Sequence, residues 1–152
     1  MTLALATPAD VEELLPLVCA YHDHEGIHST DTDRRHALRP LLEEESKEGR
    51  VWWIVETGER VGYLALCFGY SIELGGRDAF LDELFVVPAA RGRGLGTAAL
   101  EAVQTAAADL GVLALHLEVA FDNPRAQSLY RRMGFVARER FHLMTFTPHP
   151  RR

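Results

Sequence analysis

The chain has 152 residues, of which 47% are hydrophobic and 25% are charged, a composition that predicts one globular domain over residues 1–152. The formal net charge of -6 disfavours nucleic acid as a partner and mildly favours a cationic substrate. The first residues lack the pattern of a signal peptide, and no stretch approaches the ~20 apolar residues of a membrane span. Because the two cysteines suggest neither a disulfide framework nor a metal site, we expect a cytoplasmic protein without a membrane partner.

The first third of the chain predicts a short strand and two helices. Residues 3–6 form the expected strand, and Thr7 is the expected N-cap of a helix over residues 8–21. A polar loop over residues 22–32 separates this helix from a second one over residues 34–47.

The rest of the chain alternates between strands and helices. Strands are expected over residues 51–56, 61–70, 79–87, 112–120 and 135–146, the last as one strand or two, and helices over residues 98–110 and 124–133. The order β-α-α-β-β-β-α-β-α-β predicts an α/β fold in which helices flank a mixed sheet. A right-handed crossover places the strand at 112–120 beside the strand at 79–87 and parallel to it.

A glycine-rich loop separates the strand at 79–87 from the helix that follows. It reads Arg91-Gly92-Arg93-Gly94-Leu95-Gly96-Thr97. Glycines let the backbone approach a ligand closely, and a helix start offers unpaired N–H groups with a partial positive charge. Together these features suit a pyrophosphate, although a solvated connection is the alternative.

Two other kinds of phosphate loop compete with this interpretation. A P-loop needs Lys and then Ser or Thr after its last glycine, whereas Gly96 is followed by Thr97 and Ala98, so we reject it. A dinucleotide fingerprint needs G-x-G-x-x-G directly after a strand, but the spacing here is G-x-G-x-G and residues 88–91 intervene. Glu118 stands where a ribose-binding acid would lie, so the dinucleotide site remains the second hypothesis.

The loop resembles the acyl-CoA motif of the GNAT superfamily of N-acetyltransferases, which is Q/R-x-x-G-x-G/A after a strand. Arg91, Gly94 and Gly96 fill its fixed positions. A second segment, NPRAQSLYRRMGF over residues 123–135, resembles the N-x-x-A-x-x-L-Y-x-x-x-G-F segment of the same family. The two segments occur in the family's order and at its separation, so the resemblance covers nearly the whole chain.

The resemblance implies a single-domain acyl-CoA N-acyltransferase fold with a centrally splayed sheet. It also implies acetyl-CoA as co-substrate, whose pantetheine arm lies between the splayed strands and whose pyrophosphate meets the loop amides. The residues assigned to acetyl-CoA on this basis are Phe85, Val86, Val87, Arg91, Gly92, Arg93, Gly94, Leu95, Gly96, Thr97, Asn123 and Tyr130.

Acetyl transfer to an amine needs an uncharged amine, an oxyanion stabiliser and a proton for the departing thiolate. An alkyl amine has a pKa near ~10.4, so only about one molecule in 2,500 is neutral at pH 7. A carboxylate near the amine can draw off the proton, and the candidates are Asp82 and Glu83. Strand alternation puts these two on opposite faces unless a bulge intervenes. We favour Asp82 for proton relay and Glu83 for substrate binding, and the reverse assignment stays open.

The segment around these acids carries a finer resemblance. FLDELFV is similar to the Y-L-E-D-F-F-V type of segment in the spermidine/spermine acetyltransferase branch, where two acids flank the amine. Asp82 stands where that branch has Glu, and Glu83 where it has Asp. The family resemblance further implies that Tyr130 protonates the thiolate, whereas the spacing alone would suggest a helix tyrosine packed on the sheet.

The substrate side of the sequence is less informative. Tyr21 and Glu25 are expected at the rim of the acceptor cleft, and His22 and His24 find no further His or Cys at zinc spacing, so we predict no metal. The acceptor is a small-molecule amine in the leading hypothesis: a polyamine, a diamine or an amino-acid-like compound. A protein or peptide N-acetyltransferase and a non-catalytic acyl-CoA-binding module remain as alternatives. The apolar segment at 135–146 predicts a homodimer.

Overall fold

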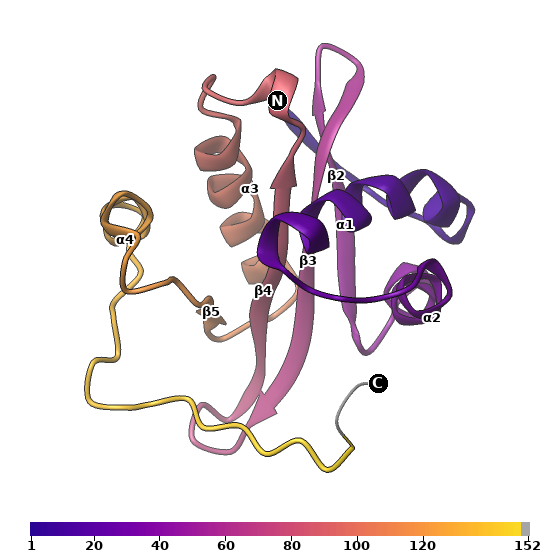
Figure 1. Cartoon of the computed structure of the whole chain (residues 1–152). Coiled ribbons are helices and arrows are strands. Elements are labelled where there is room, and N and C mark those ends of the chain that lie inside the picture. The colour runs from indigo at the N-terminus through magenta and orange to yellow at the C-terminus, as the bar shows by residue number, and fades with distance from the viewer. Residues whose placement is uncertain (150–152) are drawn as a thin grey trace. The chain divides into compact units, whose positions relative to one another are not determined.

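The structure of the protein is a computed structural model, and it describes residues 1–149. The chain divides into two compact units, Met1–Glu118 and Val119–Arg152, and each is described by itself (Figure 1). No helix among the described residues is long and apolar enough to cross a membrane.

The first unit is built on a five-stranded sheet whose spatial order follows the chain. Its strands are β1 (Thr2–Leu5), β2 (Gly49–Glu56), β3 (Glu59–Ser71), β4 (Gly76–Val86) and β5 (Leu115–His116). The first four pair antiparallel, and β5 pairs parallel to β4 through Ala79↔Leu115 and Phe80↔His116. The predicted mixed sheet and its parallel pair are therefore confirmed, although β5 is much shorter than the predicted strand over residues 112–120.

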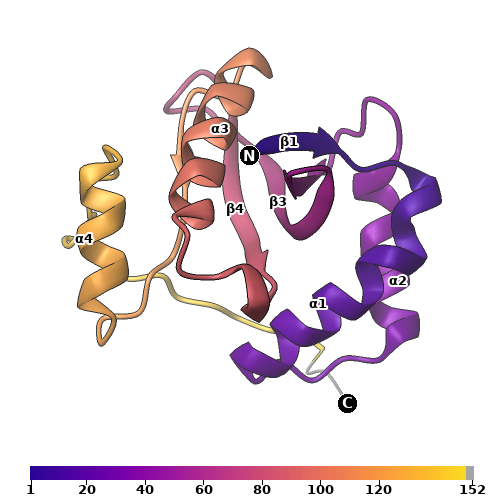
Figure 2. The same cartoon turned by 90° about the horizontal axis from the view of Figure 1, so that it is seen from above.

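Helices cover both faces of this sheet (Figure 2). On one face lie α1 (Val11–Glu25), which follows the short 3-10 helix η1 (Pro8–Asp10), and α2 (Asp31–Leu42). On the other lies α3 (Leu95–Asp109), which follows η2 (Pro88–Ala90). The neighbouring tryptophans of β2 show the alternation of a strand, since Trp53 joins the core cluster under α1 and α2 and Trp52 points the opposite way.

Local capping explains where α2 begins. The sequence predicted this helix over residues 34–47, but it starts at Asp31 because Thr30 and Asp33 form a capping box. The Thr30 hydroxyl accepts a hydrogen bond from the Asp33 amide at 3.1 Å. As a result Arg34 lies in the first turn of α2, on the same helical stripe as the buried Leu38 and Leu42.

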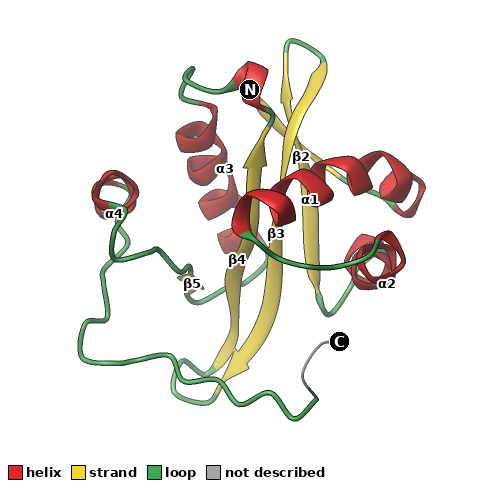
Figure 3. Cartoon of the chain, in the orientation of Figure 1, coloured by secondary structure: helices red, strands yellow, loops and turns green. Residues whose placement is uncertain are grey.

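The second unit contains α4 (Pro124–Arg132), close to the predicted helix over residues 124–133. The predicted strand over residues 135–146 is not found there, because this segment is loop throughout (Figure 3). Alternating apolar side chains supply the pattern of a strand, but a strand also needs a neighbour for its backbone groups. Within the described residues the backbone of this segment makes local contacts, from the Phe135 amide to the Tyr130 carbonyl at 3.0 Å and from the Phe141 amide to the Arg138 carbonyl at 3.2 Å.

Candidate active site

A small cavity opens in the first unit between α1, α2 and the strands β3 and β4. Its volume is about 80 Å³, well below the roughly 300–1,000 Å³ of pockets that enclose drug-sized ligands. Its polar lining comes from four elements: His22, Arg34, Tyr63, Asp82 and Glu83. The cavity can therefore hold the polar end of a small molecule rather than a large ligand.

A β-bulge brings the two predicted acids to this cavity. In the ladder of β3 and β4, Ala65 pairs with Glu83 and Leu66 pairs with Leu81, so Asp82 is the extra residue. A bulge re-aims side chains that strict alternation would send to opposite faces. Asp82 and Glu83 consequently line the same cavity, which the sequence allowed only if a bulge intervened.

Glu83 is held by two donors from different elements. The Tyr63 hydroxyl donates to Glu83 Oε2 at 2.5 Å, and His22 Nε2 lies 2.7 Å from Glu83 Oε1. On the other side of the His22 ring, Arg34 Nε donates to Nδ1 at 3.3 Å. Since Nδ1 accepts this bond, the ring proton belongs on Nε2, which donates to Glu83. The cavity thus has a fixed chain of contacts from Arg34 to Glu83.

Two neighbouring groups stay protonated because of this site. Burial, and then the nearby Glu83 carboxylate, raise the pKa of Tyr63 far above its usual value, so Tyr63 acts as a hydrogen-bond donor. Burial and the charges of Asp82 and Glu83 raise the pKa of Cys67 to about 12. A thiol with such a pKa is a poor nucleophile near neutral pH.

The predicted rim residues lie elsewhere. Tyr21 lies in α1 as predicted, whereas the structure extends α1 to Glu25, so Glu25 is helical and not part of a loop that begins at residue 22. Tyr21 packs against the hydrophobic core, with its ring centroid 6.0 Å from that of His22. Glu25 is exposed. The lining of the cavity includes neither residue, and their role in substrate binding stays a prediction.

The glycine loop has the backbone geometry that the sequence led us to expect. Gly92 and Gly94 have φ values of 79° and 76°, in the left-handed region that disfavours other residues. Gly94 is the N-cap of α3, and within residues 1–149 no side chain caps this helix start. A Cβ at Gly92, Gly94 or Gly96 would meet no described atom within 4 Å. The first amides of α3 therefore have no side-chain cap among the described residues, and an uncapped helix start of this kind fits an anion such as a pyrophosphate.

The two arginines of the loop make contacts within the protein. Arg91 Nε donates to the Val86 carbonyl at 2.8 Å, and its guanidinium lies 5.3 Å from the centroid of the Phe85 ring. Arg93 bonds Glu56 at 3.1 Å and the Ala89 carbonyl at 2.9 Å. These contacts fix the loop against the ends of β2 and β4, while the side chain of Arg93 remains 56% exposed.

The strand β4 offers an open edge next to this loop. Its pairing with β5 ends at Phe80↔His116, but β4 continues to Val86 while it stays paired with β3 on its other side. Beyond Phe80, no ladder partner among the described residues covers the β5 side of β4. The backbone around Val86 can therefore accept an extended amide-bearing chain, as the family resemblance implies for pantetheine. In this structure the Val86 carbonyl already accepts from Arg91, and the Val87 amide donates to Val61 at 2.9 Å.

The remaining predicted residues belong to the second unit. The Asn123 side chain caps α4 by accepting a hydrogen bond from the Ala126 amide at 3.1 Å. The Tyr130 ring packs edge-on against Phe135 at 5.9 Å between centroids, and burial raises the pKa of Tyr130. Their roles toward acetyl-CoA stay predictions.

Sequence reasoning missed Arg34 and Tyr63 of the cavity, and it placed His22 no more closely than in the polar rim segment that also holds Tyr21 and Glu25. His22 lies one turn after the buried Val18, and Arg34 precedes Leu38 and Leu42 at spacings of four. A polar residue on an apolar helical stripe was the available signal. Tyr63 gave no such signal, because a tyrosine in a strand is ordinary. Among residues 1–149 no group of three His, Cys, Asp or Glu is placed to hold a metal ion.

Comparison with known proteins agrees with this geometry. Residues 13–135 match the acetyltransferase (GNAT) family. An uncharacterised N-acetyltransferase of Bacillus subtilis, YhfO, is 30% identical over 135 residues, which are 89% of each chain. The thialysine N-epsilon-acetyltransferase of Bos taurus is 38% identical over 74 residues, 49% of this chain and 43% of that protein.

A solved structure extends the likeness to the whole fold. An integron cassette protein from the mobile metagenome of Cole Harbour Salt Marsh is 36% identical, with a TM-score of 0.82. The match covers 97% of this chain and 91% of that one. With its matching family segment, its mixed sheet and its open helix start, the chain belongs to the GNAT family of acetyltransferases and is an N-acetyltransferase.

Proposed function

We propose that the protein transfers an acetyl group from acetyl-CoA to the amine of a small cationic acceptor, by direct attack in a ternary complex. The observation that carries this proposal is the cavity in which Asp82 and Glu83 lie together on β4. A relative whose name gives thialysine as its acceptor supports an amine on a short chain, and the diamine or polyamine branch is another form of the same proposal.

The co-substrate would be held mainly by the backbone. The uncapped amides at the start of α3 would receive the pyrophosphate, and the open edge of β4 near Val86 would pair with the pantetheine arm. Bound acetyl-CoA supplies an activated acetyl thioester. A backbone N–H at the end of β4 would stabilise the oxyanion that forms on the thioester carbonyl.

The acids of the cavity would prepare the amine. One carboxylate takes a proton from the ammonium group, and the freed nitrogen attacks the thioester carbon. The C–S bond then breaks as the nitrogen releases its second proton to solvent, which leaves the neutral amide and the CoA thiolate. Glu83 already accepts hydrogen bonds from His22 and Tyr63, whereas Asp82 interacts with the Cys67 thiol, which is only a weak donor. This difference supports Asp82 as the proton acceptor and Glu83 as the group that positions the amine.

Direct attack is favoured over an acetylated enzyme. Cys67 lies close enough to the two acids for their charges to act on it, yet its pKa of about 12 keeps it a neutral thiol. The thiolate of CoA would then take its proton from Tyr130, as the family resemblance implies. A homodimer and a cytoplasmic location stay predictions from the sequence.

A panel of amines tests the proposal. Purified protein is incubated with acetyl-CoA and diamines, polyamines, amino acids or a peptide, and thiol release and acetylated amine are both measured. We expect release that depends on a small cationic amine, together with thermal stabilisation by acetyl-CoA. Stabilisation without turnover of any amine would favour a binding module, and a larger stabilisation by NADH would favour a dinucleotide site.

A further inference from the structure

The cavity contains a buried positive charge that acetyl transfer to a diamine does not use. Arg34, in the first turn of α2, is only 7% exposed and lines the cavity opposite the acids of β4. Arginine is almost never buried without a partner, because removing its charge from water is costly. The partners of Arg34 therefore show whether its charge is already used.

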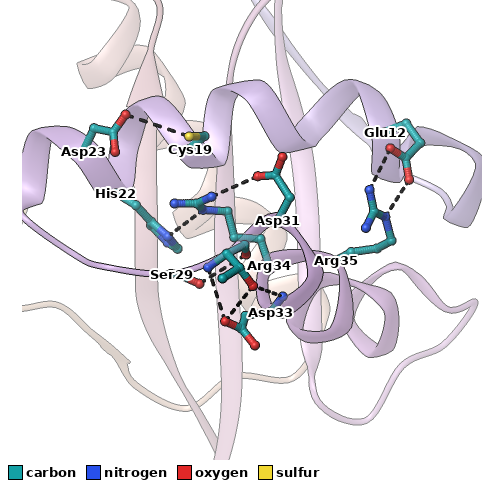
Figure 4. A network of polar contacts seen from close by, with 10 residues as sticks. Glu12, Cys19, His22, Asp23, Ser29, Asp31, Asp33, Arg34 and Arg35 are labelled. Atoms are coloured by element: carbon teal, nitrogen blue, oxygen red, sulfur yellow. Dashed lines mark hydrogen bonds and ion pairs between the residues drawn. The ribbon is translucent and has the colours of Figure 1, made fainter. Parts of the chain in front are cut away.

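Two of the five N–H groups of Arg34 have a partner among residues 1–149. Nε donates to His22 Nδ1 at 3.3 Å, and Nη1 donates to Asp31 Oδ1 at 2.9 Å, so that the guanidinium lies between the two side chains (Figure 4). His22 brings no negative charge to this contact. The Asp31 side chain is 65% exposed, so water weakens its attraction for Arg34.

The Nη2 amino group of Arg34, with two of the remaining N–H groups, is open to a ligand. It has no hydrogen-bond partner among the described residues, and it is not among the side-chain nitrogen or oxygen atoms that are buried without a hydrogen bond, so it is accessible. The space that Arg34 borders is the cavity. A planar fork of donors at this position suits a carboxylate, which can accept two of its hydrogen bonds.

The charges of the cavity are separated by one side chain. The His22 ring contacts Arg34 through Nδ1 and Glu83 through Nε2, at 3.3 and 2.7 Å. A diamine would bring no anion to the cavity side of the guanidinium, whose one ion pair in the described structure is with the exposed Asp31, and it would bring a second cation near it. A molecule with both an ammonium and a carboxylate group satisfies Arg34 and the two acids together.

We propose that the acceptor is zwitterionic, an amino acid or a compound like one, whose carboxylate is bound by Arg34 and whose amine lies at Asp82 and Glu83. This inference rests on the proposed acetyl transfer and narrows its acceptor. It makes Arg34 a residue that determines specificity, held in place by Asp31 and by His22.

Matched acceptors test this inference without any mutation. Amino acids are compared with their own carboxamides, which keep the size and lose the negative charge, and kcat/KM is expressed per concentration of free amine. We expect the acid to be favoured on the order of 10- to 100-fold, which is the usual effect of a charge-assisted hydrogen-bonded pair. An equal or better rate with the carboxamide, or with a diamine, overturns the inference and leaves acetyl transfer standing. Absence of turnover with every amine overturns both.

Variants of Arg34 then assign the preference to this side chain. R34Q is expected to abolish the ratio of acid to carboxamide, while R34K keeps part of it because the charge remains. If R34Q acted only through the lost contact with His22, kcat/KM would fall equally for the acid and the carboxamide, and their ratio would not change. That result would overturn the role of Arg34 in binding the carboxylate. If R34Q does not fold, the ratio in R34K against wild type decides the same question. The matched control is R35Q at the next residue of α2, which should keep the ratio, because Arg35 bonds Glu12 at 2.7 Å and does not line the cavity.

Discussion

The glycine loop and the acceptor cavity are both suited to charged ligands, but they use different atoms. The loop uses backbone amides at the exposed start of α3, and Gly94 leaves them uncovered by a side chain. The cavity uses side chains from α1, α2, β3 and β4, of which Arg34 and Tyr63 are buried, and His22, Tyr63 and Glu83 hold one another in place. A binding site formed by backbone amides depends on several glycines close together in the sequence. A binding site formed by side chains can combine single residues from anywhere in the chain.

The largest effect is expected from variants that disrupt the cavity and leave the glycine loop intact. Loss of a general base usually costs about 10²- to 10⁴-fold in rate, so Asp82→Asn should lower kcat most at low pH, where free amine is scarcest. Glu83→Gln should instead raise KM, because the amide no longer offers two oxygens to His22 and Tyr63. The measurement is a pH series of kcat and KM with one amine.

Acetyl-CoA binding is the control for these two variants. Both should be stabilised against heat by acetyl-CoA as much as wild type, because neither residue belongs to the loop. If each variant kept wild-type kinetics, Asp82 and Glu83 would have no part in the mechanism.

The second effect concerns Tyr130, which belongs to neither region. Tyrosine has a pKa near ~10 and a thiol near ~8.5, so proton transfer to the thiolate is uphill by roughly 2 kcal/mol. Burial raises the pKa of Tyr130 and widens this gap, which favours the low end for a general acid. We expect Tyr130→Phe to lower kcat on the order of 100-fold, with acetyl-CoA affinity nearly unchanged. An unaltered kcat and an unaltered basic limb of the pH–rate profile would indicate that Tyr130 only packs against Phe135.

The same contrast explains what the sequence could predict. The loop around Gly94 was predictable because alternating glycines at a helix start exceed what a simple turn requires, and the left-handed φ of Gly94 agrees with that. The pair of Asp82 and Glu83 was visible, but the bulge that turns both toward the cavity depends on the register with β3. Arg34 and His22 are twelve residues apart and meet only because α2 packs beside α1.

The prediction of a strand at residues 135–146 was wrong for a related reason. Its alternating pattern describes side chains, whereas a strand also depends on the neighbour that takes its backbone hydrogen bonds. The same limit applies to the strand predicted at 112–120, of which only Leu115–His116 pairs with β4. Helix boundaries also moved: α2 starts three residues earlier than predicted, at the overlooked cap Thr30, and ends at Leu42 instead of residue 47, while α1 runs on to Glu25 instead of residue 21.

The third effect is expected from a variant that disrupts the glycine loop and leaves the cavity intact. Acetyl-CoA at ~100 times its dissociation constant should stabilise the wild type by about 2.7 kcal/mol. Gly94→Val should remove this gain, because a branched side chain at φ 76° would strain the loop and cover the amides of α3. The measurement is the thermal midpoint with and without acetyl-CoA.

Gly111 provides the matched control for Gly94. It follows the other end of α3, has a φ of 74°, and a Cβ there would likewise meet no described atom within 4 Å. Gly111→Val should therefore cost similar stability in the absence of ligand but keep the gain from acetyl-CoA. Equal gains in both variants would remove the loop from acetyl-CoA binding.

The smallest effect concerns a polar cluster that serves neither region. Arg60 bonds Asp10 at 2.8 Å and Glu13 at 2.5 Å, and its guanidinium lies 4.4 Å from the centroid of a Trp53 ring. Arg60→Met keeps an apolar chain over Trp53 and removes the charge. The free energy of unfolding at pH 7 should fall by about 0.5–1 kcal/mol, the usual size for partly exposed ion pairs, and less in high salt. Neither acetyl-CoA stabilisation nor kcat should change.

The pH dependence of this loss separates charge from packing. Burial alone would raise the pKa of Asp10, but hydrogen bonds from the Thr7 amide and from Arg60 outweigh it and hold the pKa below its usual value. A carboxyl whose folded-state pKa is lowered stabilises the fold above its unfolded value of ~3.9, and this contribution disappears as the pH falls through the folded-state pKa. The difference in unfolding free energy between wild type and Arg60→Met should therefore shrink as the pH drops below ~4. A difference that stays constant from neutral pH into acid would show that Arg60 acts by packing on Trp53 and not through its charge.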